Sequence, residues 1–191
     1  MPSSTSPACL PARLWRAIGL GPVAVAVLAL ALLRGAAVAQ DVTEPALKAA
    51  FIYNFARFTT WPADLPATDS FVICVLGDAA VGDALARAVA GRQLMERPIA
   101  ITSVATAASK RGCRILYVSG VPVRQAADVV GELRDAPVLT ISNIEGFASA
   151  GGMTQFFFEH GQLRFRIHHE SAKRAGLQIS SRLLIMARPN D

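Results

Sequence analysis

The sequence is poor in the residues on which most enzymes depend, and it keeps them apart. Its 191 residues include three cysteines and three histidines. The glycine spacing at 77–82 resembles a phosphate-binding loop, but the lysine and the hydroxyl residue that would hold phosphate and Mg²⁺ are missing. A G-x-S-x-G sequence, which would carry the nucleophile of a serine hydrolase, is missing as well. The sequence therefore predicts a protein that is not an enzyme and that needs no cofactor.

Metal ligands are equally scarce. The histidines are His160, which falls in a predicted turn, and the adjacent pair His168 and His169. We place this pair on a predicted strand, where neighbouring side chains point to opposite faces and cannot hold one ion together. A zinc site would need two further ligands from elsewhere in the chain. We predict no metal site.

Acidic residues are absent from the first 39 positions. Arg13 and Arg16 precede an uncharged apolar run at 17–33, and the small residues Ala-Val-Ala follow at 37–39. This order is typical of a secretory signal peptide. We predict that residues 1–39 are removed and that residues 40–191 form a single domain in the periplasm. An uncleaved anchor helix is the alternative, because 17 apolar residues lie at the lower limit for a bilayer span.

The predicted mature chain has no strong charge of either sign. Arg13, Arg16 and Arg34 leave with the signal peptide, so 16 of the 19 basic residues remain against all 14 acidic ones, a net charge of +2. A nucleic-acid partner would need a clustered basic face. The charge balance gives no support for such a partner, and we predict none.

Few cysteines remain after export. Cys9 lies in the predicted signal peptide, which leaves Cys74 and Cys113. Two cysteines in an oxidising compartment tend to form a disulfide. A redox or metal-binding pair is the alternative, but the sequence has no C-x-x-C motif and no histidine at ligand spacing from either cysteine. We predict a structural Cys74–Cys113 disulfide, which would stabilise the fold by about 4 kcal/mol through the loop that it closes.

The mature chain does contain a regular succession of apolar and amphipathic segments. Continuous apolar runs, typical of strands buried on both faces, occur at 71–76, 98–104, 115–118 and 138–142. Helical patterns at 81–90 and 123–134 lie between these runs. Strands that alternate with helices indicate a mostly parallel sheet with helices on its faces. We predict an α/β fold, a layered sandwich with a mostly parallel sheet flanked by helices.

The pattern changes after the glycine-rich segment at 146–152. Segments 154–159 and 162–168 flank His160-Gly161, a two-residue turn of the kind that joins antiparallel strands. We predict a C-terminal antiparallel hairpin, then a short helix that ends at Gly176, then a last helix. In that last helix, four apolar side chains are expected to point inward, namely Ile179, Leu183, Leu184 and Met186.

Aromatic residues, only 7% of the chain, gather in the segment at 46–62. Leu47, Phe51, Phe55 and Phe58 form a single stripe at helical spacing. The proline of Trp61-Pro62 is expected to end the helix, because it disfavours helical backbone in the residue before it. We predict a helix that packs on the sheet with Phe51 and Phe55 buried. A binding face is the alternative.

A row of basic side chains stands out on the second strand of the hairpin. Period-two alternation points Arg164, Arg166 and His168 outward, while the apolar residues between them point inward. Phe157 lies opposite Arg164 in the predicted register, which permits a cation–π contact. We predict that these four residues form a binding site for an acidic partner or an anionic ligand. A solvated face that prevents edge-to-edge aggregation is the alternative.

Five sequence blocks resemble a known family. They are LKAAFIYNFARFTTWP, ICVLGD, GCRILYVS, VLTISNIEGFASAGGM and AGLQISSRLLIMA, in that order. They are similar to the blocks of YfiR-type periplasmic regulators, and the resemblance covers nearly all of residues 40–191. It implies an exported α/β domain that is commonly a homodimer. Cys74 and Cys113 match the family's disulfide positions, whereas Arg166 and His168 lie in a sequence, FRIH, where the family often has Phe-x-Ile-Asn.

The resemblance also implies a function. The best-understood members of that family repress an inner-membrane diguanylate cyclase by binding its periplasmic sensor region, which lowers cyclic di-GMP synthesis and biofilm formation. An outer-membrane lipoprotein can sequester the repressor. The expectation is therefore a periplasmic repressor that acts by protein–protein contact. The alternative is a periplasmic small-molecule binding or sensing protein, because open α/β sheets usually bind ligands at the carboxyl ends of their strands.

Overall fold

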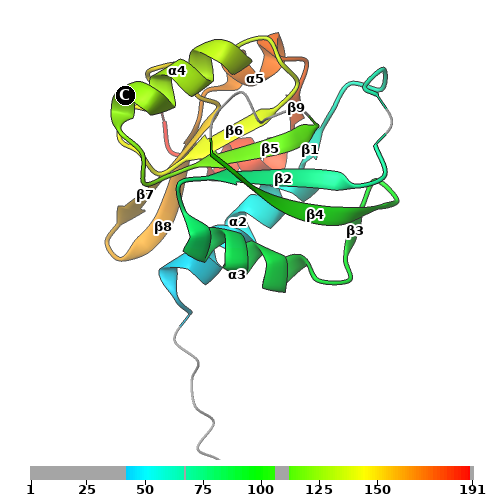
Figure 1. Cartoon of the computed structure of the whole chain (residues 1–191). Helices are drawn as coiled ribbons and strands as arrows, with labels where there is room; N and C mark the ends of the chain where they lie inside the picture. The colour runs from blue at the N-terminus through cyan, green and yellow to red at the C-terminus, as the bar shows by residue number, and fades with distance from the viewer. Residues whose placement is uncertain (1–41, 67, 106–111, 190–191) are drawn as a thin grey trace, which may run out of the picture. The chain divides into compact units, whose positions relative to one another are not determined.

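The computed structural model describes residues 42–66, 68–105 and 112–189. The predicted signal peptide at 1–39 lies outside the described residues. The main sheet has seven strands in the order β3-β4-β2-β5-β6-β7-β8 (Figure 1). The strands are β2 (Phe71–Leu76), β3 (Gln93–Leu94), β4 (Arg97–Val104), β5 (Cys113–Val118), β6 (Leu139–Ser142), β7 (Thr154–Glu159) and β8 (Gln162–Ile167).

The sheet is mostly parallel, as the sequence predicts. Neighbouring strands from β4 through β7 run parallel, and only the pairs β3–β4 and β7–β8 are antiparallel. A second, two-stranded sheet pairs β1 (Thr59–Thr60) with β9 (Gln178–Ile179). The mixed α/β architecture and the C-terminal hairpin are therefore confirmed.

Helices cover both faces of the sheet. They are α2 (Glu44–Arg57), α3 (Ala79–Val89), α4 (Val123–Leu133), α5 (His169–Arg174) and α6 (Ser181–Met186). Figure 1 shows α4 on one side of the sheet and α2 and α3 on the other. Alternate residues of one strand enter different cores: Ile73 packs with α2 and α3, whereas Leu76 packs on the α4 side. This double coverage explains why the central strands appear in the sequence as continuous apolar runs.

The aromatic segment at the start of the domain forms α2. The Thr43 side chain caps its first turn by accepting a hydrogen bond from the Ala46 amide at 3.4 Å. Phe55 is 1% exposed, and its ring centroid lies 5.1 Å from that of Phe165. Phe51 touches the same aromatic cluster but is only half-buried. The predicted burial is therefore right for Phe55 and wrong for Phe51, which lies at the rim of the stripe.

The end of α2 differs from the prediction. The helix ends at Arg57, and Phe58 caps it with its amide directed to the Asn54 and Phe55 carbonyls. Thr59 and Thr60 then leave the helical path because they pair with β9. Trp61-Pro62 therefore follows a short strand and does not end the helix itself.

Cys74 and Cys113 form a disulfide, with their Cα atoms 5.8 Å apart. The bond joins β2 to β5 in the core on the α4 side, and both cysteines are at most 3% exposed. It closes a sequence separation of 39 residues that includes α3 and β4. The predicted pairing is confirmed, and the buried position identifies a structural cross-link.

Two expectations for the C-terminal region are wrong. His168 and His169 do not lie on a strand, because β8 ends at Ile167 and α5 begins at His169. Ile179 belongs to β9, and Met186 is 58% exposed, although both were expected to point inward from one helix. The region folds as helix, strand and helix because residues 178–179 pair with the distant β1.

Candidate functional site

The hairpin that carries the predicted basic row has the predicted register. Gln155 pairs with Arg166, and Phe157 pairs with Arg164. The apolar residues that alternate with the two arginines are buried, while the arginines themselves are partly exposed. His160 and Gly161 both have positive φ, as this tight turn requires.

Arg164 turns toward the tip of the hairpin. Its Nε lies 3.9 Å from Oε2 of Glu159, and its guanidinium also donates a hydrogen bond to Gln162. Arg188 donates two hydrogen bonds to the same Glu159 carboxylate. These cations hold the pKa of Glu159 below its usual value, with the hydrogen bond from Arg188 as the largest cause. Arg164 is therefore part of an ion cluster at the tip of the hairpin.

Arg166, not Arg164, makes the cation–π contact. Its guanidinium lies 4.3 Å from the centroid of the Phe157 ring, and its Nε donates a hydrogen bond to the Pro189 carbonyl at 3.2 Å. The contact predicted between Phe157 and Arg164 is therefore wrong, although the two residues are directly opposite. The ring leans to its diagonal neighbour, which long side chains on one face of a sheet can reach.

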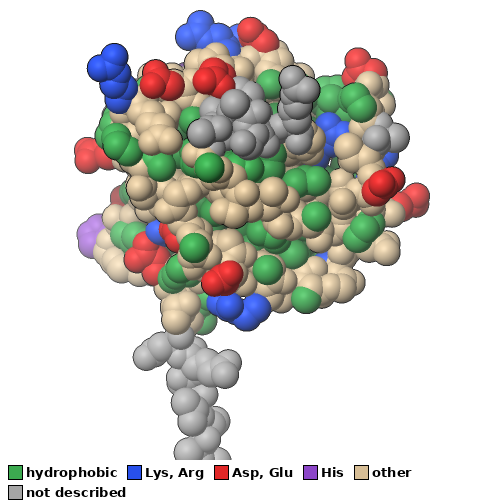
Figure 2. Space-filling view, in the orientation of Figure 1, with side chains coloured by type: hydrophobic (Ala, Val, Ile, Leu, Met, Phe, Trp, Pro, Cys, Tyr) green, Lys and Arg blue, Asp and Glu red, His purple; other side chains and the backbone are tan. Residues whose placement is uncertain are grey.

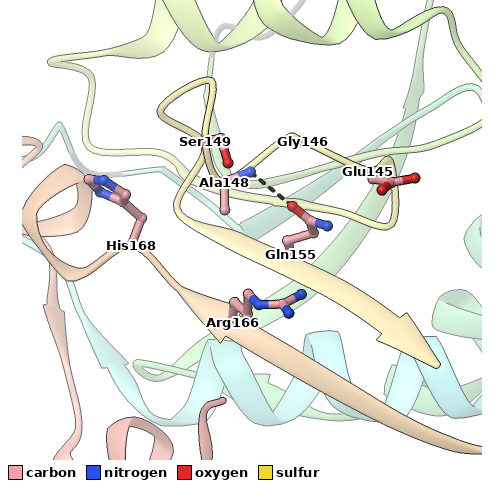
Figure 3. A pocket seen from close by; sticks show the side chains of 7 residues that line it. All are labelled: Glu145, Gly146, Ala148, Ser149, Gln155, Arg166 and His168. Carbon is pink, nitrogen blue, oxygen red and sulfur yellow. Dashed lines mark hydrogen bonds between the residues drawn. The ribbon is translucent and has the colours of Figure 1, made fainter. Parts of the chain in front are cut away.

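A pocket opens beside Arg166, with a volume of about 560 Å³. Seven residues line it, from the loop after β6, from β7 and from the end of β8 (Figure 3): Glu145, Gly146, Ala148, Ser149, Gln155, Arg166 and His168. Two members of the predicted row thus share a pocket, whereas Arg164 is not among its lining residues. The pocket lies beyond the carboxyl end of β6, a parallel strand.

The loop that forms one wall of the pocket is held by side chains beneath it. The buried Gln155 accepts a hydrogen bond from the Ala148 amide at 3.1 Å (Figure 3). Thr140 accepts one from the Met153 amide at 3.1 Å. A β-carbon on Gly152 would lie 2.3 Å from the Phe147 ring, so only glycine allows the loop to close this tightly. These contacts shape the pocket before any ligand arrives.

His168 lines the pocket and also caps α5. Its Nδ1 accepts a hydrogen bond from the Ser171 amide at 3.2 Å. A neutral imidazole with an accepting Nδ1 carries its proton on Nε2. The Arg166 guanidinium, which also lines the pocket, is a donor suited to an anion. Glu145, on the same loop, adds a carboxylate.

A model of the YfiR/HmsC-like family matches residues 45–188. The chain belongs to the YfiR/HmsC-like family. No curated protein matches it. Membership of this family suggests periplasmic regulation of a diguanylate cyclase. None of the described helices is long and apolar enough to cross a membrane.

In this YfiR/HmsC-like protein, the blocks ICVLGD and GCRILYVS end in the turns after β2 and β5. These turns meet where an open α/β sheet usually binds a ligand. The chain leaves β2 toward β4 and leaves β5 toward β6, so the connections diverge between the ends of β2 and β5. A β-carbon on Gly77 would lie 2.0 Å from the Ser119 carbonyl oxygen, and one on Gly120 would lie 2.6 Å from the Gly77 carbonyl oxygen. The two turns therefore fill this crevice with backbone, and the pocket lies instead beyond β6.

Three side chains that line the pocket beside Arg166 were not predicted from the sequence: Glu145, Ser149 and Gln155. Gln155 occupies an outward position of the predicted hairpin, and the other two belong to a loop without periodicity. One signal was available, because a glycine-rich loop directly after a buried parallel strand is a common place for a binding site. That signal locates the loop but not the residues that face Arg166.

Proposed function

We propose that the protein is a periplasmic repressor of an inner-membrane diguanylate cyclase, whose periplasmic sensor region it binds. The observation that carries this proposal is the family match over residues 45–188. The buried Cys74–Cys113 disulfide supports it, because such cross-links persist in oxidising compartments. Removal of residues 1–39 as a signal peptide belongs to the same proposal.

The binding surface of this proposal is the basic hairpin surface, which we define as Phe157, Arg164, Arg166 and His168. All four side chains are partly exposed. The surface offers two guanidinium groups and an aromatic face, which suit acidic and planar groups of a partner. Binding would repress the cyclase by a shift in population, because a partner that prefers the inactive arrangement of the sensor region stabilises that arrangement.

Two further partners complete the proposal. An outer-membrane lipoprotein that sequesters this protein would release the cyclase. A second copy of the chain would form a homodimer. Neither association requires a cofactor.

Reversing the charge of the basic hairpin surface should abolish most repression. In an Arg164→Glu, Arg166→Glu variant, an acidic partner would meet like charge, which costs several kcal/mol when groups are juxtaposed. The variant also loses the cation–π contact of Arg166 and the ion pair of Arg164 with Glu159. The free energy of unfolding should therefore fall by about 1–2 kcal/mol, because exposed contacts of each kind contribute up to about 1 kcal/mol. Cyclic di-GMP in cells and the Tm of the purified variant measure the two effects.

The matched control carries the same charge change on α4, outside the basic hairpin surface. Arg124→Glu, Arg134→Glu alters two exposed arginines at the ends of α4 and should leave repression intact. Partner binding to the wild-type protein should also weaken with added salt, which screens exposed charges over roughly 8–10 Å. Full repression by a folded hairpin variant would refute the basic hairpin surface and leave it as a solvated face.

A second candidate function is supported by the pocket beside Arg166. Arg166 and His168 both line a space of about 560 Å³, a volume typical of small-molecule sites. The preformed loop, held by Gln155, reduces the entropy cost of binding. A small anion, such as a carboxylate or a phosphate ester, fits these donors, and its binding would make the protein a sensor.

Calorimetric titration with small carboxylates and phosphate esters tests this second function. Arg166→Gln should weaken binding by about tenfold or more, because a hydrogen bond to a charged group contributes roughly 1.5–3 kcal/mol. Arg164→Gln is the control, since Arg164 lies outside the lining of the pocket. Equal binding by wild type and Arg166→Gln would place the ligand elsewhere.

A further inference from the structure

The two edges of the seven-stranded sheet are protected very differently. At the β8 edge, the Arg188 amide donates a hydrogen bond to the Phe165 carbonyl at 2.9 Å, and Leu163 and Phe165 are no more than 5% exposed. At the other edge, β3 pairs only with Arg97 and Pro98, the first two residues of β4. From Ile99 to Val104, no strand among the described residues pairs with the outer side of β4.

The backbone groups that point out of this edge can be identified. The Ile99 amide donates a hydrogen bond to the Arg92 carbonyl at 3.3 Å, so Ile99 directs its backbone groups away from β2. Strand geometry has a period of two, and Ile101 and Ser103 therefore point their N–H and C=O groups the same way. Among the described residues, no backbone hydrogen bond uses these outward groups of Ile101 and Ser103.

Beyond Pro98, which pairs with β3, this edge lacks the features that keep open strands apart. Exposed edges usually carry charged residues, often lysine, but residues 98–104 have the sequence PIAITSV. Ile99, Ala100 and Ile101 are only half-buried, while Thr102 and Ser103 are exposed. Figure 2, in the orientation of Figure 1 with β4 toward the viewer, shows backbone and hydrophobic side chains across the middle of this face and charged side chains mainly at its margins. Such an edge favours pairing with another strand.

Helix α3 packs beside this edge on β4 and presents complementary charges to solvent. Asp83 and Arg87 are both exposed on the face of α3 that also carries Ala79, Ala86 and Ala90. Neither charge forms an ion pair with another described residue. The small neighbours allow a second helix to approach closely, and one acid and one base four residues apart make this face complementary to itself in an antiparallel pair.

We propose that β4 pairs antiparallel with β4 of a second copy of this chain, about a two-fold axis at Thr102. This register uses the outward groups best, because Ile101 exchanges two hydrogen bonds with Ser103 of the partner subunit and Ser103 exchanges two with Ile101 of the partner subunit. It also leaves undisturbed the Arg92 carbonyl that accepts from the Ile99 amide. The same axis places Thr102 opposite Thr102 of the partner subunit. A continuous sheet results, with both α3 helices on one face.

The two-fold axis also brings the α3 helices together. Because they run antiparallel across the axis, Asp83 approaches Arg87 of the partner subunit, and the converse pair forms as well. An isologous contact of this kind is self-complementary and closed, so it yields a dimer and no longer assembly. The inference rests on the homodimer of the proposed function and specifies its interface.

Light scattering after size-exclusion chromatography of residues 40–191 over a range of concentrations tests the interface. Thr102→Lys places a cation on the edge opposite the partner's strand and near its own symmetry copy, and should raise the Kd of the dimer at least tenfold, about the effect of juxtaposed like charges. Thr102→Val keeps the shape and adds no charge, and should leave the Kd within about threefold. Ser103→Pro removes an outward N–H that β4 does not use within the subunit, and should weaken the dimer as well.

A charge swap on α3 keeps the test independent of changes to β4. Asp83→Arg should weaken the dimer, and Asp83→Arg combined with Arg87→Asp should restore it. A wild-type protein that is monomeric at about 100 µM would overturn both the homodimer and this interface. A dimer that survives Thr102→Lys, Ser103→Pro and Asp83→Arg would overturn the β4 interface alone. Repression of the cyclase, measured separately on the same variants, reports on the proposed function, and its loss in a variant that still dimerises would not count against β4.

Discussion

Replacing Phe55 with alanine should lower the free energy of unfolding by about 3–5 kcal/mol, the usual cost of emptying a buried phenylalanine site. Phe55 is 1% exposed, and its ring centroid lies 5.9 Å from that of Phe156 and 5.1 Å from that of Phe165. The ring therefore holds α2 against both strands of the hairpin. Urea denaturation followed by circular dichroism measures the change, with the slope of the transition as a check on two-state behaviour.

Phe51 provides the matched control, because it has the same chemistry on the same helix with less burial. Its ring lies 6.0 Å from both Phe156 and Phe165, but the side chain is only half-buried. Phe51→Ala should therefore cost clearly less than Phe55→Ala. An equal cost would mean that the rim of the stripe is as tightly packed as its centre. A stable Phe51→Ala protein that no longer represses the cyclase would instead identify α2 as a recognition surface.

Removing the disulfide should cost the protein about 2–5 kcal/mol, as it does for small exported domains in general. The chain-entropy estimate for the 39-residue separation is about 4 kcal/mol. Both cysteines are buried among apolar side chains, so Cys74→Ala, Cys113→Ala removes the cross-link without placing a hydroxyl in the core. The midpoint of urea unfolding, measured with and without a thiol reductant, gives the effect.

The reductant separates loss of the bond from loss of side-chain volume. Wild-type protein should lose stability when reduced, and the double alanine variant should not respond to reductant. Periplasmic protein measured by mass spectrometry without reduction should be two hydrogens lighter than its reduced form. Two free thiols in the native protein would contradict the disulfide, and an unchanged midpoint on reduction would show that the bond contributes no stability.

Local sequence was sufficient for the elements whose structure depends on near neighbours. The register of the β7–β8 hairpin follows from the two-residue turn at His160-Gly161 and from the alternation on each side of it. The parallel strands follow from apolar runs that only double burial explains. The disulfide was predictable from the expected export, which would leave only Cys74 and Cys113 to pair.

Only half of the candidate site was predictable, because a local pattern shows which side chains share a strand face but not which loop lies beside them. Arg166 and His168 are visible as members of an alternating row, but Arg164 of the same row does not line the pocket that they share. Arg164 joins Glu159 and Arg188, and Arg166 leans over Phe157 beside the pocket. Glu145 and Gln155 reach this pocket from a loop and a strand whose relative placement no local pattern encodes.

Sequence by itself determined the family, the α/β class, the hairpin register and the pair of cysteines, because each depends on a short pattern or on the identity of single residues. Tertiary structure alone decided that Phe55 is enclosed while Phe51 is not, and that backbone fills the crevice between Gly77 and Gly120. It also decided that β4 lies at an open edge. A strand carries the same apolar pattern whether one or both of its hydrogen-bonding edges are paired. Only the order of the strands in the sheet therefore shows which backbone groups of Ile101 and Ser103 have no partner among the described residues.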